Sequence, residues 1–462
     1  MSNLFKDLKR YKKKVSLIDE KFGEITYSQL VNEAEKVKKK IASNSVALLI
    51  SDNKSEFITG YIAFLQKKNI ISIIIDQTFS VNFILKIISL YKPNYFFCSN
   101  RLKENFKKNV DLKTVHDFHD FSIYRTNYNF HEKVNFKNFL LISTSGTTQN
   151  PKFVRLSEEN LKDNLYKIIA SLKITKIHRT ITTMPLAYSY GLSILNSHLL
   201  SGATTVLNSK SVIDKNFWLT IKKYKVNSFG GVPELYKYLK RINFEKYISK
   251  SITYLTQAGG KLEEKTLKYI GEICKKKNIK FYVMYGQTEA APRISCLDWK
   301  DFFFKINSIG KPLRGYKIKL VDKKKKIIDK INTKGEIMFL GKNVSLGYAN
   351  NLNDLKKGDE NNQTLFTGDL AKKDKQNFFY IVGRKNRIFK LFGKRYNLDD
   401  IEDFFKRKGI KTKCKIENLK IKINFKSTFD EKKEIDSVSN FLGINKNFIV
   451  LSKDFKKTFK DI

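Results

Sequence analysis

The chain has 462 residues, of which 41% are hydrophobic and 13% aromatic, and this composition excludes a disordered protein. A chain of this length exceeds what one compact core holds, so we expect roughly two or three domains. The formal net charge of +44 arises from 89 Lys and Arg against 45 Asp and Glu. Taken alone, that charge suggests a nucleic acid or an acidic membrane surface as partner.

The distribution of the basic residues argues against a nucleic-acid partner. The lysines lie in small scattered clusters, such as Lys12–Lys14 and Lys323–Lys326, and the sequence contains no basic tail and no nucleic-acid-binding motif. The chain is also rich in Ile, Asn, Phe and Tyr, which are residues of AT-rich codons. Codon bias therefore explains the excess of lysine better than nucleic-acid binding does, although a general positive field still attracts anionic ligands.

Cysteines, histidines and apolar runs indicate a cytoplasmic protein without a membrane span. The four cysteines are far apart and form no C-x-x-C pair, which is typical of reduced thiols. The five histidines are equally scattered and form no metal cluster. No apolar stretch follows the basic N-terminus as in a signal peptide. The longest aliphatic run, Ile70–Ile75, is far shorter than the roughly 20 residues that cross a bilayer.

The first hundred residues alternate strand-like and helix-like segments. Strands are predicted at Val46–Ile50, Ile70–Ile75 and Tyr95–Cys98, and helices after Thr26 and at Phe57–Lys67 and Val81–Leu90. Such alternation favours a parallel sheet with helices on both faces. Residues 101–135 are polar, aromatic and poorly periodic, and their pattern predicts no element.

The segment that follows carries phosphate-binding chemistry. An apolar run, Phe139–Ile142, predicts a buried strand, and directly after Ser143 comes a run of small residues, Thr144, Ser145, Gly146, Thr147 and Thr148. A backbone that approaches closely at the glycine, with hydroxyl donors on either side, suits a triphosphate. Lys152 adds a positive charge. Taken alone, the run is better explained as a Ser/Thr-rich surface turn, and no G-K-[ST] closes it as a Walker loop. A helix is predicted at Glu158–Ile174 with Ser157 as its N-cap.

Several later segments combine glycines with polar or aromatic side chains. They are P-L-A-Y-S-Y-G at Pro185–Gly191, Q-A-G-G at Gln257–Gly260, Y-G-Q-T-E at Tyr285–Glu289, T-G-D at Thr367–Asp369 and G-R-K-N-R-I-F-K-L-F-G at Gly383–Gly393. Together with T-S-G-T-T-x-x-P-K, they resemble, in the same order, the motifs of the adenylate-forming superfamily. This superfamily contains acyl-CoA synthetases, aryl-CoA ligases, non-ribosomal peptide adenylation domains and luciferases. The chain looks closest to acyl or aryl ligases of surface-polysaccharide and secondary-metabolite clusters.

The resemblance implies both a fold and a reaction. The expected fold is α/β: a large domain of parallel sheets flanked by helices with a small β-rich subdomain, residues 1–383, and a small mobile α+β lid, residues 384–462. The implied reaction is ATP-dependent activation of a carboxylic acid to acyl-AMP with release of pyrophosphate. Transfer to a thiol follows, on CoA or on the phosphopantetheine of a carrier protein. An acidic acyl carrier protein is a possible partner for so basic a chain.

The resemblance also assigns contacts with ATP and Mg²⁺. Tyr285 is expected to stack on adenine, Thr288 to bind the α-phosphate, and Glu289 to hold Mg²⁺ with Thr144 as a second ligand. Asp369 suits the two ribose hydroxyls because a carboxylate accepts both hydrogens, and Arg384 is expected to reach the ribose too. The remaining implied contacts with ATP are Ser145, Gly146, Thr147, Thr148, Lys152, Gly259, Gly260, Gly286 and Gln287.

The implied acyl pocket disfavours an amino acid substrate. Tyr188 stands where relatives often have a histidine, and the pocket is expected to be walled by Tyr188, Tyr190, Gly191, Gly231 and Gly259. Relatives that activate amino acids carry an Asp in this segment. No carboxylate occurs between Thr182 and Leu200, and a buried ammonium without a partner is costly.

The C-terminal part carries the weakest match. Asn386 occupies the hinge position between large domain and lid, where a residue tolerant of large φ/ψ changes is needed. Relatives have a catalytic lysine near the C-terminus, but the tail LSKDFKKTFKDI lacks the usual glycine. Its position favours Lys457, with Lys460 and Lys456 as alternatives, beside Lys152 and Glu289 as the other catalytic residues. A degenerate nucleotide-binding protein with little turnover is therefore the alternative function.

Overall fold

The structure is a computed structural model that describes residues 4–106, 109–128, 134–143, 151–385, 388–391, 394–417, 420–426 and 429–452. The chain divides into two compact units. The first consists of Met1–Ser143 and Phe153–Val382, and the second is formed mainly by Gly383–Ile462. The expected division into a large catalytic domain, residues 1–383, and a mobile lid, residues 384–462, stays a prediction.

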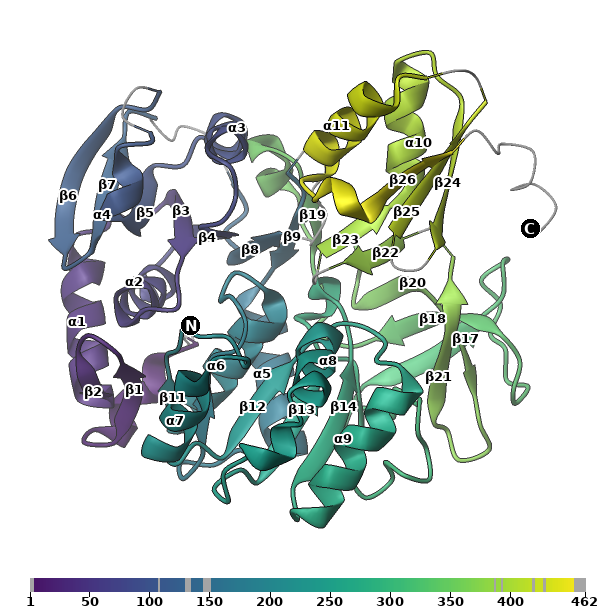
Figure 1. Cartoon of the computed structure of the whole chain (residues 1–462). Helices are drawn as coiled ribbons and strands as arrows, with labels where there is room; N and C mark the ends of the chain where they lie inside the picture. The colour runs from purple at the N-terminus through teal and green to yellow at the C-terminus, as the bar shows by residue number, and fades with distance from the viewer. Residues whose placement is uncertain are drawn as a thin grey trace. The chain divides into compact units, whose positions relative to one another are not determined.

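The larger of the two main sheets in the first unit has nine strands within the described residues, and its centre is parallel (Figure 1). In spatial order the strands are β16 (Lys311–Pro312), β15 (Ser295–Leu297), β14 (Lys280–Tyr285), β13 (Tyr254–Gln257), β12 (Ser228–Gly231), β10 (Arg179–Ile181), β11 (Thr204–Val206), β1 (Val15–Asp19) and β2 (Gly23–Thr26). Antiparallel strands close both edges, β15 and β16 on one side and β2 on the other.

The second main sheet has eight strands in the described part of the chain. Their spatial order is β19 (Gly347–Ala349), β9 (Phe153–Leu156), β8 (Leu140–Ser143), β4 (Ile70–Asp76), β3 (Ser45–Ser51), β5 (Tyr95–Ser99), β7 (Phe121–Thr126) and β6 (Leu112–Phe118). Strands β8, β4, β3 and β5 run parallel, as the alternation of elements predicts. The segment with no predicted element contains the antiparallel pair β6 and β7.

Helices cover both faces of each main sheet. They are α1 (Tyr27–Lys39), α2 (Ser55–Gln66), α3 (Val81–Tyr91), α4 (Asn100–Lys103), α5 (Glu158–Leu172), α6 (Ser189–Leu200), α7 (Lys215–Lys223), α8 (Pro233–Arg241) and α9 (Glu264–Lys276). Short 3-10 helices occur at Lys6–Tyr11, Phe244–Lys246, Thr288–Ala290 and Leu352–Lys356. The predicted Ser157 cap is confirmed, since its side chain accepts a hydrogen bond from the backbone at the start of α5. Thr26 caps the start of α1 in the same way, where the sequence predicts a helix to begin.

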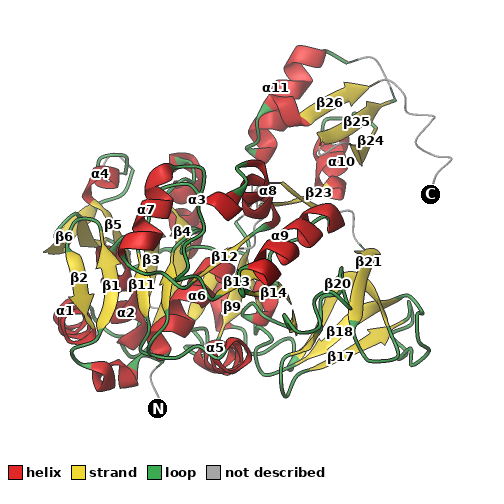
Figure 2. Ribbon diagram, turned by 60° about the horizontal axis from the view of Figure 1, so that its bottom comes forward, coloured by secondary structure: helices red, strands yellow, loops and turns green. Residues whose placement is uncertain are grey.

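Alternating side chains of the strands build separate hydrophobic layers. In β3, Ala47 and Leu49 belong to a core with α1, α2, α5 and α6, whereas Val46, Leu48 and Ile50 belong to another core with α3. This follows from the two-residue period of a strand, which sends neighbouring side chains to opposite faces. Helices α7, α8 and α9 share a third core with strands β12–β14, and Figure 2 shows α8 and α9 lying across these strands.

A smaller four-stranded sheet completes the first unit. Its order is β17 (Lys317–Val321), β18 (Gly335–Leu340), β20 (Thr364–Lys373) and β21 (Phe379–Arg384). It corresponds to the predicted β-rich subdomain.

The second unit is a small α+β structure with its own core. It contains a hairpin of β22 (Ile388–Leu391) and β23 (Lys394–Asn397) and a sheet of β24 (Thr412–Glu417), β25 (Lys420–Phe425) and β26 (Ile449–Ser452). Two helices, α10 (Leu398–Arg407) and α11 (Glu431–Leu442), pack against that sheet, and a 3-10 turn covers Lys446–Phe448. The predicted α/β fold class is confirmed. None of the helices that the structure describes is long and apolar enough to cross a membrane.

Candidate active site

Several predicted site residues lie at the carboxyl ends of three neighbouring parallel strands. Gly231 ends β12 and pairs with Gln257 of β13, which pairs in turn with Val283 of β14. Residues that follow these positions, Gly259 and Tyr285, therefore lie at the same edge of the sheet. The carboxyl edge of a parallel sheet is where open α/β folds bind ligands.

The Y-G-Q-T-E segment makes a tight turn directly after β14. A Cβ atom at Gly286 would lie 1.8 Å from the carbonyl oxygen of Pro292, so only glycine fits there. Thr288–Ala290 then forms a single 3-10 turn in which Glu289 is buried. The side chain of Gln257 braces the neighbouring turn after β13 by donating to the carbonyl oxygen of Gly260 at 2.9 Å, and Gly259 there has φ +86°.

Glu289 is held by a tyrosine from a distant part of the sequence. The Tyr348 hydroxyl donates to Glu289 Oε1 at 2.9 Å, and the backbone N–H of Ser345 donates to the carbonyl oxygen of Glu289 at 2.9 Å. Glu289 is only 5% exposed. Carboxylate oxygens are the ligands that Mg²⁺ prefers. Glu289 therefore fits the role of metal ligand that the sequence predicts.

Tyr285 and Asp369 meet although 84 residues separate them. The Tyr285 hydroxyl donates to Asp369 Oδ2 at 2.6 Å, and Asp369 is 3% exposed. The T-G-D segment lies within strand β20, where the register with β18 shifts and Gly368 has φ +72°. Such a bulge changes the direction in which the side chains of its residues point. It brings the predicted adenine and ribose contacts together.

The start of helix α6 joins this cluster through a pair of hydroxyls. Ser189 Oγ lies 3.1 Å from Thr288 Oγ1, which places the predicted α-phosphate contact beside the Tyr188–Gly191 segment. Gly191 packs closely, because a Cβ there would lie 2.6 Å from the carbonyl oxygen of Pro185. Partial burial raises the pKa of Tyr188 to about 12, so this phenol stays protonated at neutral pH.

The side chain of Tyr190 occupies the space beside Gly230 and Gly259, which have no side chains. Its hydroxyl donates to the carbonyl oxygen of Thr256 at 2.9 Å. A Cβ at Gly230 would lie 2.7 Å from the Tyr190 hydroxyl, and one at Gly259 would lie 3.9 Å from its ring. At Gly231 the corresponding space is taken by Leu235 at 2.7 Å. The structure thus brings Tyr190 and Gly259 together, and the assignment of Gly231 to the pocket stays a prediction.

Other predicted site residues are not placed in this cluster. The hydroxyl-rich loop, the hinge and the catalytic tail lysine lie outside the described residues: Thr144, Ser145, Gly146, Thr147, Thr148, Asn386 and Lys457. Lys152 is described and exposed, directly before β9, and Arg384 is half-buried at the end of β21. Their predicted contacts with ATP stay predictions.

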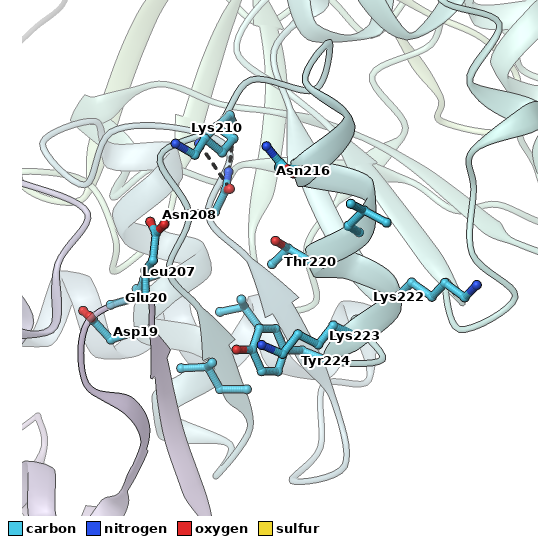
Figure 3. Close-up of a pocket in the computed structure, with 13 residues that line it drawn as sticks. Asp19, Glu20, Leu207, Asn208, Lys210, Asn216, Thr220, Lys222, Lys223 and Tyr224 are labelled. Carbon is cyan, nitrogen blue, oxygen red and sulfur yellow. Dashed lines mark hydrogen bonds between the residues drawn. The ribbon is translucent and has the colours of Figure 1, made fainter.

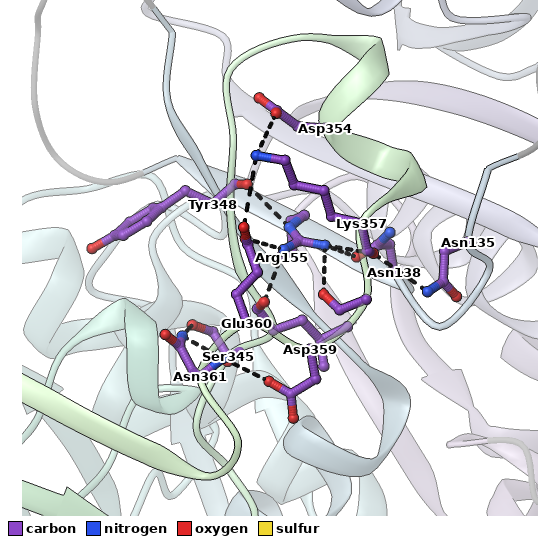
Figure 4. A network of polar contacts seen from close by, with 12 residues as sticks. Asn135, Asn138, Arg155, Ser345, Tyr348, Asp354, Lys357, Asp359, Glu360 and Asn361 are labelled. Atoms are coloured by element: carbon purple, nitrogen blue, oxygen red, sulfur yellow. Dashed lines mark hydrogen bonds and ion pairs between the residues drawn. The ribbon is translucent and has the colours of Figure 1, made fainter.

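A buried arginine on strand β9 organises the loop that carries Tyr348 (Figure 4). Arg155 is 0% exposed. Its guanidinium donates to the carbonyl oxygens of Leu346, Tyr348, Lys357 and Gly358, to Asn138 Oδ1 and to Glu360 Oε2. Strand β19 also pairs with β9, with Tyr348 opposite Val154. Arg155 thereby fixes the backbone from which Tyr348 reaches Glu289.

Sequence reasoning did not assign roles to Arg155, Tyr348 or Ser189. Gly347–Tyr348 matches a weak motif of the superfamily, but nothing in its spacing indicates a contact with Glu289, which lies 59 residues earlier. Arg155 is the one charged residue in an otherwise apolar strand. In the sequence, that charge was the signal that could have indicated a buried polar network.

A separate pocket of about 900 Å³ lies elsewhere in the first unit (Figure 3). It is lined by residues after β1 and β11 and by α7, including Asp19, Asn208, Lys210, Asn216 and Lys223. Asp19 accepts hydrogen bonds from the backbone N–H groups of Lys21 and Ser55, which gives it a structural role. None of the predicted site residues lines this pocket.

Comparison with known proteins identifies the family. The model of the AMP-binding enzyme family matches residues 4–349, and the chain therefore belongs to that family. Among curated proteins, the oxalate–CoA ligase of Arabidopsis thaliana is 26% identical over 268 residues, 57% of this chain and 51% of the relative. The 2-succinylbenzoate–CoA ligase of Bacillus cereus (strain Q1) is 30% identical over 250 residues, 54% of this chain and 50% of the relative. The chain spans about half the length of the curated relatives it matches.

Solved structures share the fold over nearly the whole chain. O-succinylbenzoate CoA synthetase (MenE) of Bacillus subtilis, bound to a product analogue, superposes with a TM-score of 0.79 at 19% identity, covering 98% of this chain and 95% of that one. IdnL1 gives a TM-score of 0.79 at 16% identity and covers 97% of both chains. At these identities the likeness establishes the fold, which is that of the adenylate-forming enzymes.

Proposed function

We propose that this protein activates a carboxylic acid with ATP, forming acyl-AMP and pyrophosphate, and then transfers the acyl group to a thiol of CoA or of a carrier-protein phosphopantetheine. The observation that carries the proposal is the cluster of Tyr285, Thr288, Glu289 and Asp369 at the carboxyl edge of the sheet. Membership of the AMP-binding enzyme family supports it. MenE, which shares the fold, has been solved with ATP and magnesium and with an acyl-adenylate intermediate.

The first half-reaction needs positioning and charge neutralisation more than covalent chemistry. Asp369 would accept the ribose hydroxyls, Tyr285 would lie against the adenine, and Thr288 would donate to the α-phosphate. Glu289 would hold Mg²⁺, which when bound offsets the phosphate charge that repels an incoming carboxylate. In the described part of the chain, no group of three His, Cys, Asp or Glu side chains is arranged for a metal. Thr144 would be the second protein ligand, and phosphate oxygens and water would supply the others.

The second half-reaction and the catalytic lysines belong to the same proposal. Lys152, the hydroxyl-rich loop and Thr144 would bind the leaving phosphates, and Lys457 would contact the reacting oxygens. Rotation of residues 384–462 about Asn386 would then admit the thiol and exclude water from the adenylate. The free cysteines, three of them buried, support an enzyme that works in the reducing cytoplasm.

Release of pyrophosphate from purified protein tests the proposal. ATP and Mg²⁺ would be supplied with a panel of fatty, aryl, hydroxy and amino acids, first without thiol and then with CoA. We expect a strong signal with one class of acid and a weak one with amino acids. ATP binding without turnover on any acid would favour a degenerate nucleotide-binding protein, and absence of ATP binding would contradict the proposal.

A further inference from the structure

Arg293 is a second buried arginine, and it lies beside the predicted acyl pocket. Its side chain is 2% exposed. Its backbone is fixed from two sides: Asn164 accepts from its N–H at 3.2 Å, and the amides of Asn164 and Asn343 donate to its carbonyl oxygen at 2.7 and 3.1 Å. The residue is therefore held in place within the structure and cannot move its backbone toward solvent without breaking three hydrogen bonds.

The charge of Arg293 is poorly compensated by the protein. A guanidinium has five N–H donors, and here the hydrogen-bond acceptors are Met284 Sδ at 2.9 Å and Ser193 Oγ at 3.3 Å. Its Nε has no hydrogen-bond partner. No Asp or Glu among the described residues forms an ion pair with it, and burial lowers the pKa of Arg293. Buried charges in proteins are ordinarily paired.

Arg155 shows how the same chain satisfies a buried arginine whose role is structural. Its guanidinium donates to four carbonyl oxygens, an amide oxygen and the Glu360 carboxylate. Arg293 instead has a thioether, a long contact with the Ser193 hydroxyl and the neutral Tyr190 side chain. The difference indicates that the anion suited to Arg293 comes from outside the chain.

The surroundings of Arg293 connect it with the substrate. Its Cζ lies 4.0 Å from the centroid of the Tyr190 ring, and Tyr190 in turn lies against Gly259 and Gly230. Arg293 follows the Y-G-Q-T-E segment by four residues, so the pocket wall and the nucleotide contacts share one stretch of chain. The Tyr190 side chain occupies the space beside Gly230, which leaves little room there for a long acyl chain.

We propose that Arg293 binds a second carboxylate of the substrate, so that the enzyme activates a short dicarboxylic acid at one end while Arg293 holds the other. This inference rests on the proposed function and names its substrate class. The reacting carboxylate would lie beside Thr288, and the distal carboxylate would accept hydrogen bonds from the guanidinium, as charge-assisted pairs do. Since the Tyr190 ring lies against the Arg293 guanidinium, that ring must shift when the acid binds.

Matched pairs of acids test the proposal on the wild-type protein. Pyrophosphate release would be compared for succinate against butanoate, glutarate against pentanoate, and phthalate against benzoate. We expect kcat/KM to favour at least one diacid over its monoacid by about ten-fold or more, the effect of one hydrogen bond to a charged group. Preference for the monoacid in every pair would overturn the proposal.

Substitutions assign the preference to Arg293. In Arg293→Met, which keeps length and removes charge, we expect the diacid preference to disappear while KM for ATP stays unchanged, and Arg293→Lys should retain part of it. Arg101→Met, at an arginine whose side chain is 65% exposed, is the control and should match the wild type. An equal loss on all acids in Arg293→Met would indicate a purely structural role and would contradict the assignment.

Binding without turnover separates this inference from the proposed function. The melting temperature of the wild type should rise with glutarate but not with pentanoate, and Arg293→Met should lose this response. Such a shift in a protein that releases no pyrophosphate would support Arg293 as an acid-binding residue and contradict the ligase reaction. Pyrophosphate release without any preference for a diacid would support the ligase reaction and contradict the role of Arg293 in binding the acid.

Discussion

Glu289 is the residue on which the proposed chemistry depends most. Replacing it by Gln keeps the shape and removes the charge that would hold Mg²⁺. We expect acid-dependent pyrophosphate release to fall by about 100-fold, as when a single group that stabilises transition-state charge is lost, and the Mg²⁺ optimum to move to higher concentration. The measurement is initial rate against Mg²⁺ concentration. Glu56→Gln, at a glutamate that is 2% exposed in α2, is the matched control and should stay within a few-fold of the wild type.

Tyr348 positions Glu289 through one hydrogen bond, and its removal gives a smaller effect. In Tyr348→Phe the carboxylate loses the donor at 2.9 Å. We expect kcat/KM for MgATP to fall by about ten-fold, which corresponds to about 1.4 kcal/mol.

A variant of Tyr91 is the control that distinguishes loss of the contact with Glu289 from a general loss of stability. The Tyr91 hydroxyl is buried and donates to the carbonyl oxygen of Ala349 at 2.9 Å, next to Tyr348 in the chain. Tyr91→Phe should lower stability by about 1 kcal/mol and leave the steady-state constants unchanged. Equal kinetic losses in both variants would show that the loop, and not the contact with Glu289, is responsible.

His198 makes stability depend on pH. It is 3% exposed, its Nδ1 lies 2.8 Å from the carbonyl oxygen of Ile194, and its Nε2 lies 3.1 Å from the Tyr254 hydroxyl. Burial lowers its pKa from 6.5 to about 4. The unfolded chain therefore binds a proton near pH 6.5 that the folded chain takes up only near pH 4. Stability is full above pH 6.5 and declines by up to about 3 kcal/mol as the pH falls to 4.

Denaturant unfolding between pH 4 and pH 7 measures this contribution. His198→Gln should remove that part of the decline, whereas His119→Gln, at an exposed histidine, should leave it unchanged. An identical pH slope in the wild type and His198→Gln would contradict the assignment to His198.

At the scale of elements, the polar network around Arg155 joins strand β9 to the segment from Leu346 to Glu360. Arg155→Met would remove four hydrogen bonds to carbonyl oxygens of this segment, three of them part-buried and one buried, together with the bond to Asn138. We expect the free energy of unfolding to fall by about 3 kcal/mol or more, judged by urea denaturation.

The ion pair within that network contributes less than the carbonyl contacts. The Glu360 side chain is 46% exposed, so Glu360→Gln should cost less than about 1 kcal/mol. If Glu360→Gln were as destabilising as Arg155→Met, the ion pair and not the carbonyl contacts would hold the loop.

Elements with local signals could be predicted from the sequence, and contacts between distant segments could not. Helix α1 follows a Thr26 cap and has apolar residues at helical spacing, and β3 and β4 are short apolar runs. Strand β6 was missed because its polar residues, most of them partly or fully exposed, blur the two-residue period. Strand β7 is largely buried, but Ser122 and Arg125 interrupt its apolar residues. The T-G-D segment was assigned by its motif alone, and the bulge that it forms within β20 could not be predicted from the sequence.

The same distinction applies to the site. Motifs placed Tyr285, Thr288, Glu289 and Asp369 in one site, and the structure brings all of them to one edge of the molecule's first unit. The partners that fix them, Tyr348 and Ser189, come from other segments and are set by tertiary packing. Arg293 was not singled out because its proposed role depends on its contacts in three dimensions. Among the described residues these contacts include no carboxylate.

At the scale of the whole molecule, the high positive charge does not define the function. Most of the lysines that form ion pairs are exposed and have partners on the same element or a neighbouring surface, as in Lys36–Glu33 and Lys268–Glu264. Such pairs contribute little to stability. The chain instead belongs to the AMP-binding enzyme family and divides into two compact units. In the function proposed above, the first unit would hold the nucleotide and the acid.

The transfer of oxygen from the acid to AMP tests the central claim most directly. An acid that supports turnover would be labelled with ¹⁸O in its carboxylate and incubated with the enzyme, ATP, Mg²⁺ and CoA, and the AMP would be analysed by mass spectrometry. If the carboxylate attacks the α-phosphorus, one labelled oxygen stays with AMP when the thiol takes the acyl group. AMP with one ¹⁸O atom is the result we predict, and label in inorganic phosphate together with ADP, or no label in AMP, would contradict adenylation.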